Sequence, residues 1–315
     1  MSARHAARSD AQPQSGRRWR VGVYTVCTPH LSPAEVVEQV AHSPVLAGVE
    51  WRVTDDPWSG PPDEPVSFLG RNAATLTACE DGADEAARLA GAAGVATIAW
   101  NPYLRVGDLD GVEQHASLAA RAAAGGLRLR AAEYMSGEPV DQVLRDSRRF
   151  VARAGEICAR HGVRVLVEMH QRTVCASASA ARRLVDGLPP EQVGVIYDIG
   201  NTVIEGYEDP RVATAVLGPH LAHVHLKNAA WERTAAGAWR SRWVPLDEGQ
   251  VDVPAFLDHL DSIGYAGWVS LEDLSTHRPP AQTLRYNEAL LSAWLTHNSI
   301  TPPDARHSDT PGRRT

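Results

Sequence analysis

The sequence has few cysteines and no long apolar run, and both absences narrow the class of protein. Its 315 residues contain four cysteines, and no two of them form a C-x-x-C pair. Scattered cysteines in a chain of this size argue for a reducing compartment, so we expect a cytoplasmic protein. No segment approaches the roughly 18–20 apolar residues of a membrane span. The N-terminal segment also lacks the apolar stretch of a signal peptide.

An excess of basic charge is missing as well. The chain carries 31 basic and 38 acidic residues, for a formal net charge of −7. A net negative charge does not attract nucleic acid or an anionic membrane, so we expect neither as a partner. The G-x-G-x-x-G turn of a dinucleotide-binding sheet is absent too, because the segment after the first predicted strand reads CTPHLSPAE.

Short β-branched runs alternate with alanine-rich segments of helical period, which is typical of βα units around a parallel sheet. Eight such pairs predict a single α/β domain, a (β/α)₈ or TIM barrel, over residues 19–298. The polar segments 1–18 and 299–315 are predicted to be disordered tails. We predict strands at 21–27, 47–53, 95–100, 127–133, 163–169, 193–198, 221–227 and 267–272, and helices at 33–43, 84–93, 112–125, 141–161, 177–187, 208–217, 253–263 and 282–296. Segments 54–82 and 228–252 are predicted to be long loops at the barrel mouth.

Ionisable side chains gather where the predicted strands end, which is where barrels place their catalytic groups. Within each strand they alternate with apolar neighbours, so they share one face. The other face must pack against the helices, and the ionisable set therefore points into the barrel. Inward charges are costly unless they are paired or bind a metal. The set comprises Glu50, Arg52, Glu168, His170, Asp198, His223, His225, Lys227 and Glu272, and the amide of Asn201 follows Asp198.

Four members of this set form a candidate metal centre: Glu168, Asp198, His225 and Glu272. Three carboxylates and one imidazole favour one divalent ion, Mn²⁺ or Mg²⁺, with Co²⁺ and Zn²⁺ as alternatives. Such an ion would chelate a carbonyl and an adjacent hydroxyl and stabilise an enediolate. Glu168 and Glu272 come from different sides of the barrel axis, so one can remove a proton and the other can return it.

Several neighbouring residues have two interpretations. His223 is either structural or a support for His225, and Lys227 contacts substrate, pairs with a carboxylate or is solvated. Arg52 pairs with Glu50 or contacts substrate, and both can hold together. Trp51 is expected to face the helices. An aromatic of the segment Trp100-Asn101-Pro102-Tyr103 is expected to wall a sugar pocket, and Cys27 to line the mouth without acting as a nucleophile.

The motifs resemble those of the sugar phosphate isomerase/epimerase family, the xylose isomerase-like TIM barrels. They are GVEWR (48–52), RHGVRVLVEMH (160–170), VGVIYDIGN (193–201), HVHLKN (223–228) and the segment 245–273 that ends SLED. The resemblance implies that Glu168, Asp198, His225 and Glu272 bind the metal and that Glu168 and Glu272 serve as acid and base. It also implies substrate-binding roles for Glu50, Arg52, His170, Asn201 and Lys227, and a homodimer or homotetramer.

Two positions depart from the ketose 3-epimerase branch of that family. Asn201 stands where that branch usually has histidine, and Trp231 stands where it usually has arginine. These departures argue against a free-ketose 3-epimerase and favour the broader isomerase branch of the family.

The resemblance and the residues together predict an isomerase or epimerase for a sugar or polyol-derived keto compound. No phosphate cradle follows the last two strands, which favours an unphosphorylated substrate. The alternative is a dehydratase of the inosose or 3-dehydroshikimate type with the same metal site. A metal-dependent phosphodiesterase is disfavoured by the acidic charge. A non-catalytic barrel is disfavoured by the intact set of four ligands.

Overall fold

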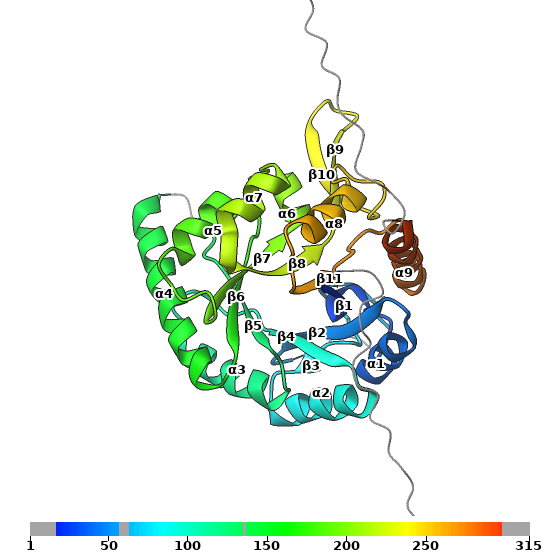
Figure 1. Ribbon diagram of the computed structural model, residues 1–315, viewed down its shortest axis with the longest axis horizontal. Helices are drawn as coiled ribbons and strands as arrows, with labels where there is room; N and C mark the ends of the chain where they lie inside the picture. The colour runs from blue at the N-terminus through cyan, green and yellow to red at the C-terminus, as the bar shows by residue number, and fades with distance from the viewer. Residues whose placement is uncertain (1–16, 57–62, 135–136, 298–315) are drawn as a thin grey trace, which may run out of the picture.

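Eight parallel strands close into a barrel in the computed structural model, which describes residues 17–56, 63–134 and 137–297 (Figure 1). The first strand pairs with the second on one side and with the last on the other, which closes the sheet. All eight predicted strands are confirmed. They are β1 (Arg20–Tyr24), β2 (Leu46–Thr54), β4 (Ala96–Asn101), β5 (Gly126–Arg130), β6 (Arg164–Glu168), β7 (Val193–Asp198), β8 (Leu221–Leu226) and β11 (Trp268–Leu271), with a short β3 (Leu76–Thr77) appended to β2.

The helices surround this barrel, as Figure 1 shows. Each of the eight predicted helices is present. Helix α1 begins with a capping box, in which Ser32 and Glu35 bond each other's backbone amides. Gly162 follows α4 in the left-handed conformation, with φ 70°. The helices are α1 (Pro33–His42), α2 (Glu80–Ala93), α3 (Leu109–Arg121), α4 (Val140–Arg160), α5 (Ala178–Val185), α6 (Ile199–Ile204), α7 (Pro210–Leu217), α8 (Val253–Ser262) and α9 (Pro280–His297), with 3₁₀ turns at Thr25–Cys27 and Gly218–His220.

The main core lies between the sheet and the helices. Trp51 and Trp100 are fully buried there, and Trp100 Nε1 donates to His115 on α3. The prediction for Trp51 is therefore confirmed. Trp100 walls no pocket, because Asn101 faces inward to Glu50 and Trp100 faces the helices instead. Tyr103, the other aromatic of that segment, does line a cavity at the barrel mouth.

A smaller apolar cluster occupies the barrel interior. Ile98, Leu166 and Ile196 form it together, with Trp268 packed against them. Gly22 makes room for it, because a Cβ there would lie 2.2 Å from Ile98 Cδ1. This apolar filling leaves the upper interior, at the carboxyl ends of the strands, for the polar side chains.

Two segments differ from their predicted loops. Segment 228–252 contains a hairpin of β9 (Asn228–Arg233) and β10 (Trp239–Val244), which projects from the barrel in Figure 1. Segment 54–82 contains β3 and the first turn of α2, while Trp58 lies outside the described residues. The predicted tails also fall outside them, apart from residues 17 and 18. Within the described part of the chain, no helix is long and apolar enough to cross a membrane.

Candidate active site

Four strands bring the candidate metal ligands together. Glu168 and Asp198 are the last residues of β6 and β7, His225 lies on β8, and Glu272 directly follows β11. The register of the parallel strands places the ligands at a similar height along the barrel axis, since Asp198 is paired with His225. Each residue offers one ligand atom, and these atoms all lie within 4.8 Å of one another. All four side chains are buried. The sequence-based grouping therefore corresponds to one compact cluster.

The ring of His225 is held so that one nitrogen faces the three carboxylates. Its Nε2 lies 2.9 Å from Glu50 Oε1. Its Nδ1 lies 3.1 Å from Glu272 Oε2, 3.5 Å from Glu168 Oε1 and 4.0 Å from Asp198 Oδ2. Among the described residues, Nδ1 makes no hydrogen bond of acceptable geometry. Histidines that ligate metals commonly donate their second ring N–H to a carboxylate in this way.

Two buried cations partly neutralise the carboxylates. Arg128 Nη1 lies 3.1 Å from Glu168 Oε2. Lys227 Nζ lies 2.7 Å from Asp198 Oδ2 and 2.9 Å from Glu272 Oε2. Lys227 is the only lysine in the chain, among 31 basic residues. A compact ammonium can bridge two carboxylates as a point charge, whereas the planar guanidinium fork of arginine cannot take the same place.

These contacts set the protonation of the cluster. Burial opposes ionisation of Glu272, but Lys227 and His225 outweigh it and lower its pKa to about 2. Burial likewise opposes ionisation of Glu168, while Arg128 and His225 hold its pKa well below the usual range. Burial, reinforced by the negative charges of Glu272 and Glu168, raises the pKa of Asp198 to about 7 despite Lys227. Both glutamates are therefore ionised at neutral pH and can accept a proton.

Glu50 lies beneath this cluster rather than beside a substrate. Its side chain is fully buried, and its Oε2 accepts from His223 Nε2 at 2.9 Å. Asn101 Nδ2 also donates to it. Arg52 does not pair with Glu50, one of its two interpretations, but donates to Tyr103 Oη at 3.1 Å, to Thr75 and to the Leu69 carbonyl. Glu50 thus positions two histidines, and His223 is part of this support.

Asn201 also lies behind the cluster. Its backbone N–H donates to Asp198 Oδ1 at 2.9 Å, and its Nδ2 donates to Asp198 Oδ2 at 2.6 Å. Asp198 is the N-cap of α6, so this spacing of three residues has a capping origin. The structure therefore gives Asn201 a positioning contact with Asp198, in place of the predicted contact with substrate.

A cavity of about 250 Å³ opens above the cluster. This volume is below the roughly 300–1,000 Å³ of sites for drug-sized ligands and suits a small substrate. Of the candidate ligands, Glu168 and Glu272 line it. Of the other predicted substrate contacts, His170 and Lys227 line it. The remaining lining residues are Tyr24, Val26, Leu69, Tyr103, Arg128, Arg130, Gln171, Trp243 and Leu274.

Sequence reasoning missed Arg128 and Arg130, although a signal was present. Both alternate with leucines in β5, whose sequence is GLRLR, so their side chains share one face. Cys27 does not line this cavity, contrary to the expectation from the sequence. It is buried against the carbonyls of Tyr24 and Leu271, and burial raises the pKa of its thiol, which disfavours the thiolate.

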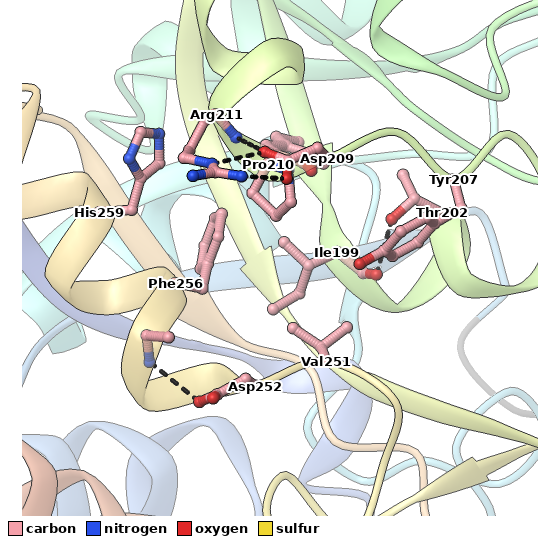
Figure 2. A pocket seen from close by; sticks show the side chains of 12 residues that line it. Ile199, Thr202, Tyr207, Asp209, Pro210, Arg211, Val251, Asp252, Phe256 and His259 are labelled. Carbon is pink, nitrogen blue, oxygen red and sulfur yellow. Dashed lines mark hydrogen bonds and ion pairs between the residues drawn. The ribbon is translucent and has the colours of Figure 1, made fainter. Parts of the chain in front are cut away.

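A second cavity, of about 340 Å³, lies among α6, α7 and α8, outside the barrel mouth (Figure 2). Ile199, Val251 and Phe256 give it apolar walls. Arg211 Nη2 donates to Asp209 Oδ2 at 2.8 Å, and Figure 2 shows the two side chains directed at each other. We call it the outer cavity, and the cavity above the cluster the central cavity.

A closed (β/α)₈ barrel with three carboxylates and a histidine at its strand ends defines a class of enzyme scaffold with a candidate metal centre. Residues 66–293 match the family described as xylose isomerase-like TIM barrel. The chain belongs to this family, as its motifs predicted.

Similar proteins include an inosose dehydratase from Geobacillus thermodenitrificans, 27% identical over 134 residues, which are 38% of this chain and 43% of that protein. The chain thus spans less than half the length of that relative. The structure resembles a 3-keto-D-glucoside 4-epimerase from E. coli (17% identity, TM-score 0.64, 89% of this chain and 99% of that one). It also resembles a probable 3-DHS dehydratase from Bacillus anthracis, with 19% identity and a TM-score of 0.63 over 90% of this chain and 100% of that one. A xylose isomerase-like TIM barrel protein from Mycobacterium smegmatis, in complex with magnesium, is similar as well, with 16% identity and a TM-score of 0.57 over 88% of this chain and 98% of that one. At these identities the structures show the shared fold.

Proposed function

We propose that the protein is a divalent-metal-dependent isomerase or epimerase of a sugar or polyol-derived keto compound. It would abstract a proton next to the substrate carbonyl and pass through an enediolate. The observation that carries the proposal is the orientation of His225, whose Nε2 is held by Glu50 while Nδ1 faces three carboxylates without a hydrogen bond.

The residues present fit a divalent ion. Glu168, Asp198, His225 and Glu272 would hold it, and their oxygen-rich set favours Mn²⁺ or Mg²⁺. The magnesium in the M. smegmatis relative supports this choice of ion class. When bound, the ion would supply a Lewis acid for a carbonyl oxygen and an adjacent hydroxyl. Glu50, His223 and His225 also lie close together, but their facing atoms already hydrogen-bond one another below the cavity.

The two glutamates are placed for proton transfer. Both line the central cavity, whereas Asp198 and His225 lie behind them. Because both are ionised, either can accept a proton from a substrate carbon. Their cationic partners differ, since Glu168 bonds Arg128 and Glu272 bonds Lys227. The epimerase among the structural neighbours supports this assignment.

A dehydratase is the second candidate, and the similarity to inosose dehydratase favours it. The same glutamate would remove the proton next to the carbonyl, and a β-hydroxyl would leave as water. The buried Lys227 ammonium lies 2.9 Å from Glu272 Oε2, where it can donate toward a leaving oxygen.

Solvent deuterium uptake tests the proposal. The Mn²⁺-loaded protein is incubated in D₂O with a panel of ketoses, aldoses, inososes and keto acids, and the products are read by mass spectrometry. Glu168→Gln is the variant, and Glu232→Gln, on the exposed β9–β10 hairpin, is the matched control. We expect one deuterium in the product, lost in Glu168→Gln and retained in Glu232→Gln.

The position of the label separates the candidates. Deuterium on the neighbouring carbon indicates isomerisation, deuterium on a carbon of inverted configuration indicates epimerisation, and a product lighter by one water indicates dehydration. Turnover with full activity in Glu168→Gln would overturn the proposed proton transfer.

A further inference from the structure

The described lining of the central cavity contains two carboxylates, the candidate metal ligands Glu168 and Glu272, and four basic side chains. The basic side chains are Arg128, Arg130, His170 and Lys227. A site built for a neutral polyol would present carboxylates and amides to the hydroxyl groups, as acceptors as well as donors. Within the described lining, Gln171 is the one amide and the remaining side chains are apolar or aromatic. The lining of the central cavity is therefore rich in hydrogen-bond donors.

Arg128 has bonding capacity that its neighbours leave unused. Its guanidinium is buried, and Nε makes no hydrogen bond with any described residue. Its one carboxylate partner, Glu168, is also a candidate metal ligand. A metal ion would share the charge of that carboxylate and weaken its hold on Arg128. The guanidinium lies over the rings of Tyr24 and Tyr103, at 5.6 and 5.3 Å, which fix its plane.

Arg130 repeats this arrangement nearer the solvent. It follows Arg128 by two residues in β5, so both side chains lie on the same face. Its Nη2 bonds Glu133 at 2.9 Å and lies 3.3 Å from His170 Nδ1, while Nε makes no hydrogen bond within the described part of the chain. Glu133 is more than half exposed, so solvent screens much of its charge.

The tyrosines add donors to the same lining. Tyr24 Oη is buried and makes no hydrogen bond among the described residues. Tyr103 Oη accepts from Arg52 Nε at 3.1 Å, which leaves its own hydroxyl hydrogen available. Two guanidinium groups and two hydroxyl groups thus converge on one side of a cavity of about 250 Å³.

We infer that the substrate carries a carboxylate, which Arg128 and Arg130 bind at the β5 wall of the cavity, next to Glu168. This inference rests on the proposed function and narrows it, because it points to a polyhydroxylated keto acid instead of a neutral ketose or inosose. Arginine suits this task because its planar fork matches a carboxylate with two parallel hydrogen bonds.

Matched acid and neutral probes test the inference without turnover. The first pair is shikimate and its methyl ester, and the second is D-glucuronate and D-glucose. Binding to the Mn²⁺-loaded full chain is measured by isothermal titration calorimetry at constant ionic strength. A charged hydrogen-bonded contact makes the expected preference for the acid about tenfold to a hundredfold in at least one pair.

Two variants locate the preference. Arg130→Met should remove most of it and leave binding of the neutral probe unchanged, while Arg130→Lys should keep part of it. Arg128→Met is the second variant, but Arg130 is one-third exposed and so gives a readout even if the buried position does not tolerate change. Arg121→Met is the matched control, because this residue lies on the exposed face of α3 and bonds Asp84.

The outcomes separate this inference from the proposed function. Equal binding of acid and neutral probe in both pairs, including no binding of either, would overturn the inference, and so would a preference that survives both arginine variants. Mn²⁺ binding and deuterium uptake, measured on the same samples, report on the proposed function independently. A third comparison uses myo-inositol 1-phosphate and myo-inositol. A larger preference there, lost in Arg130→Met, would overturn the assignment to a carboxylate in favour of a phosphate.

Discussion

The central and outer cavities differ in how their charged side chains are satisfied. In the outer cavity, which is larger at about 340 Å³ against about 250 Å³, Arg211 pairs with Asp209 and Asp252 caps α8 by accepting from Ala255 N at 3.1 Å. In the central cavity, three carboxylates share two cations, and His225 Nδ1 makes no hydrogen bond with any described residue. Volume therefore does not distinguish the two cavities as candidate sites. The clustering of buried carboxylates around one histidine nitrogen does distinguish them.

The physical reason is the cost of burying like charges together. Carboxylates within a few ångströms repel one another in a low-dielectric interior, and burial together with the charges of Glu272 and Glu168 raises the pKa of Asp198 to about 7. A buried ion pair is often no more stable than a hydrophobic replacement, so packing alone does not account for the cluster. A divalent cation, as proposed, would offset this repulsion.

The largest expected effect in the central cavity comes from Glu272→Gln. The change removes a candidate metal ligand and proton acceptor while keeping the shape of the side chain. We expect deuterium uptake to fall about 10²–10⁴-fold and Mn²⁺ binding to weaken. Asp209→Asn in the outer cavity is the matched control, with uptake unchanged. Normal turnover in Glu272→Gln would remove this residue from the mechanism.

Glu50→Gln should weaken Mn²⁺ binding about 10–100-fold, the usual cost of losing a carboxylate behind a ligating histidine. Burial opposes ionisation of Glu50, but His225 and His223 outweigh it and hold its pKa well below the usual range, so the variant removes a true negative charge. Calorimetric titration with Mn²⁺ measures the effect. An unchanged dissociation constant would show that His225 needs no such support.

Lys227→Met should act in the opposite direction and tighten Mn²⁺ binding, by roughly tenfold if one repulsive charge is removed from the cluster. The metal-free protein should melt at a lower temperature, because Asp198 and Glu272 lose their shared cation. Because Lys227 is the only lysine, reductive ¹³C-methylation places one side-chain label in the chain. Broadening of that NMR signal by paramagnetic Mn²⁺ would report the contact directly, and weaker Mn²⁺ binding in Lys227→Met would contradict it.

Mn²⁺ binding should also depend on pH. Burial raises the pKa of Asp198 to about 7, so below that pH the carboxyl is protonated and cannot ligate. Affinity should therefore fall as pH decreases through 7, by roughly fivefold to tenfold from pH 7.5 to pH 6 for the Asp198 proton alone. The fall should be steeper overall, because His225 must also lose a proton to ligate. Burial opposes protonation of His225, but Glu50 and Glu272 outweigh it and raise its pKa. Titrations in buffers of different ionisation enthalpy would count the released protons. A constant affinity over this range would show that Asp198 is already ionised.

The sequence predicted the strands and the four candidate ligands because both depend on local patterns. Alternation fixes which face of a strand a side chain shares, and the closed barrel brings all carboxyl ends to one rim. Thus Glu168, Asp198, His225 and Glu272 could be grouped before their distances were known.

The contacts of Glu50, Arg52 and Asn201 could not be predicted in the same way. All three are polar, lie at strand ends and face the interior, as a substrate contact would. Their depth depends on strand stagger and side-chain length, which place Glu50 beneath His225 and Asn201 behind Asp198. The β9–β10 hairpin was missed because a loop rich in tryptophan and arginine carries its period-2 signal only faintly.

The smallest effect on the central site is expected from the outer cavity, and Phe256→Ala tests this. Phe256 is buried on α8 and packs edge-on against Tyr197, at 5.6 Å between ring centroids. Its truncation should destabilise the fold by about 3–5 kcal/mol, measured by urea unfolding. The dissociation constant for Mn²⁺ should not change, because the perturbation reaches the cluster only through well-packed strands. If Mn²⁺ binding weakened as much as in Glu50→Gln, the two cavities would be coupled, and charge satisfaction would no longer be enough to tell them apart.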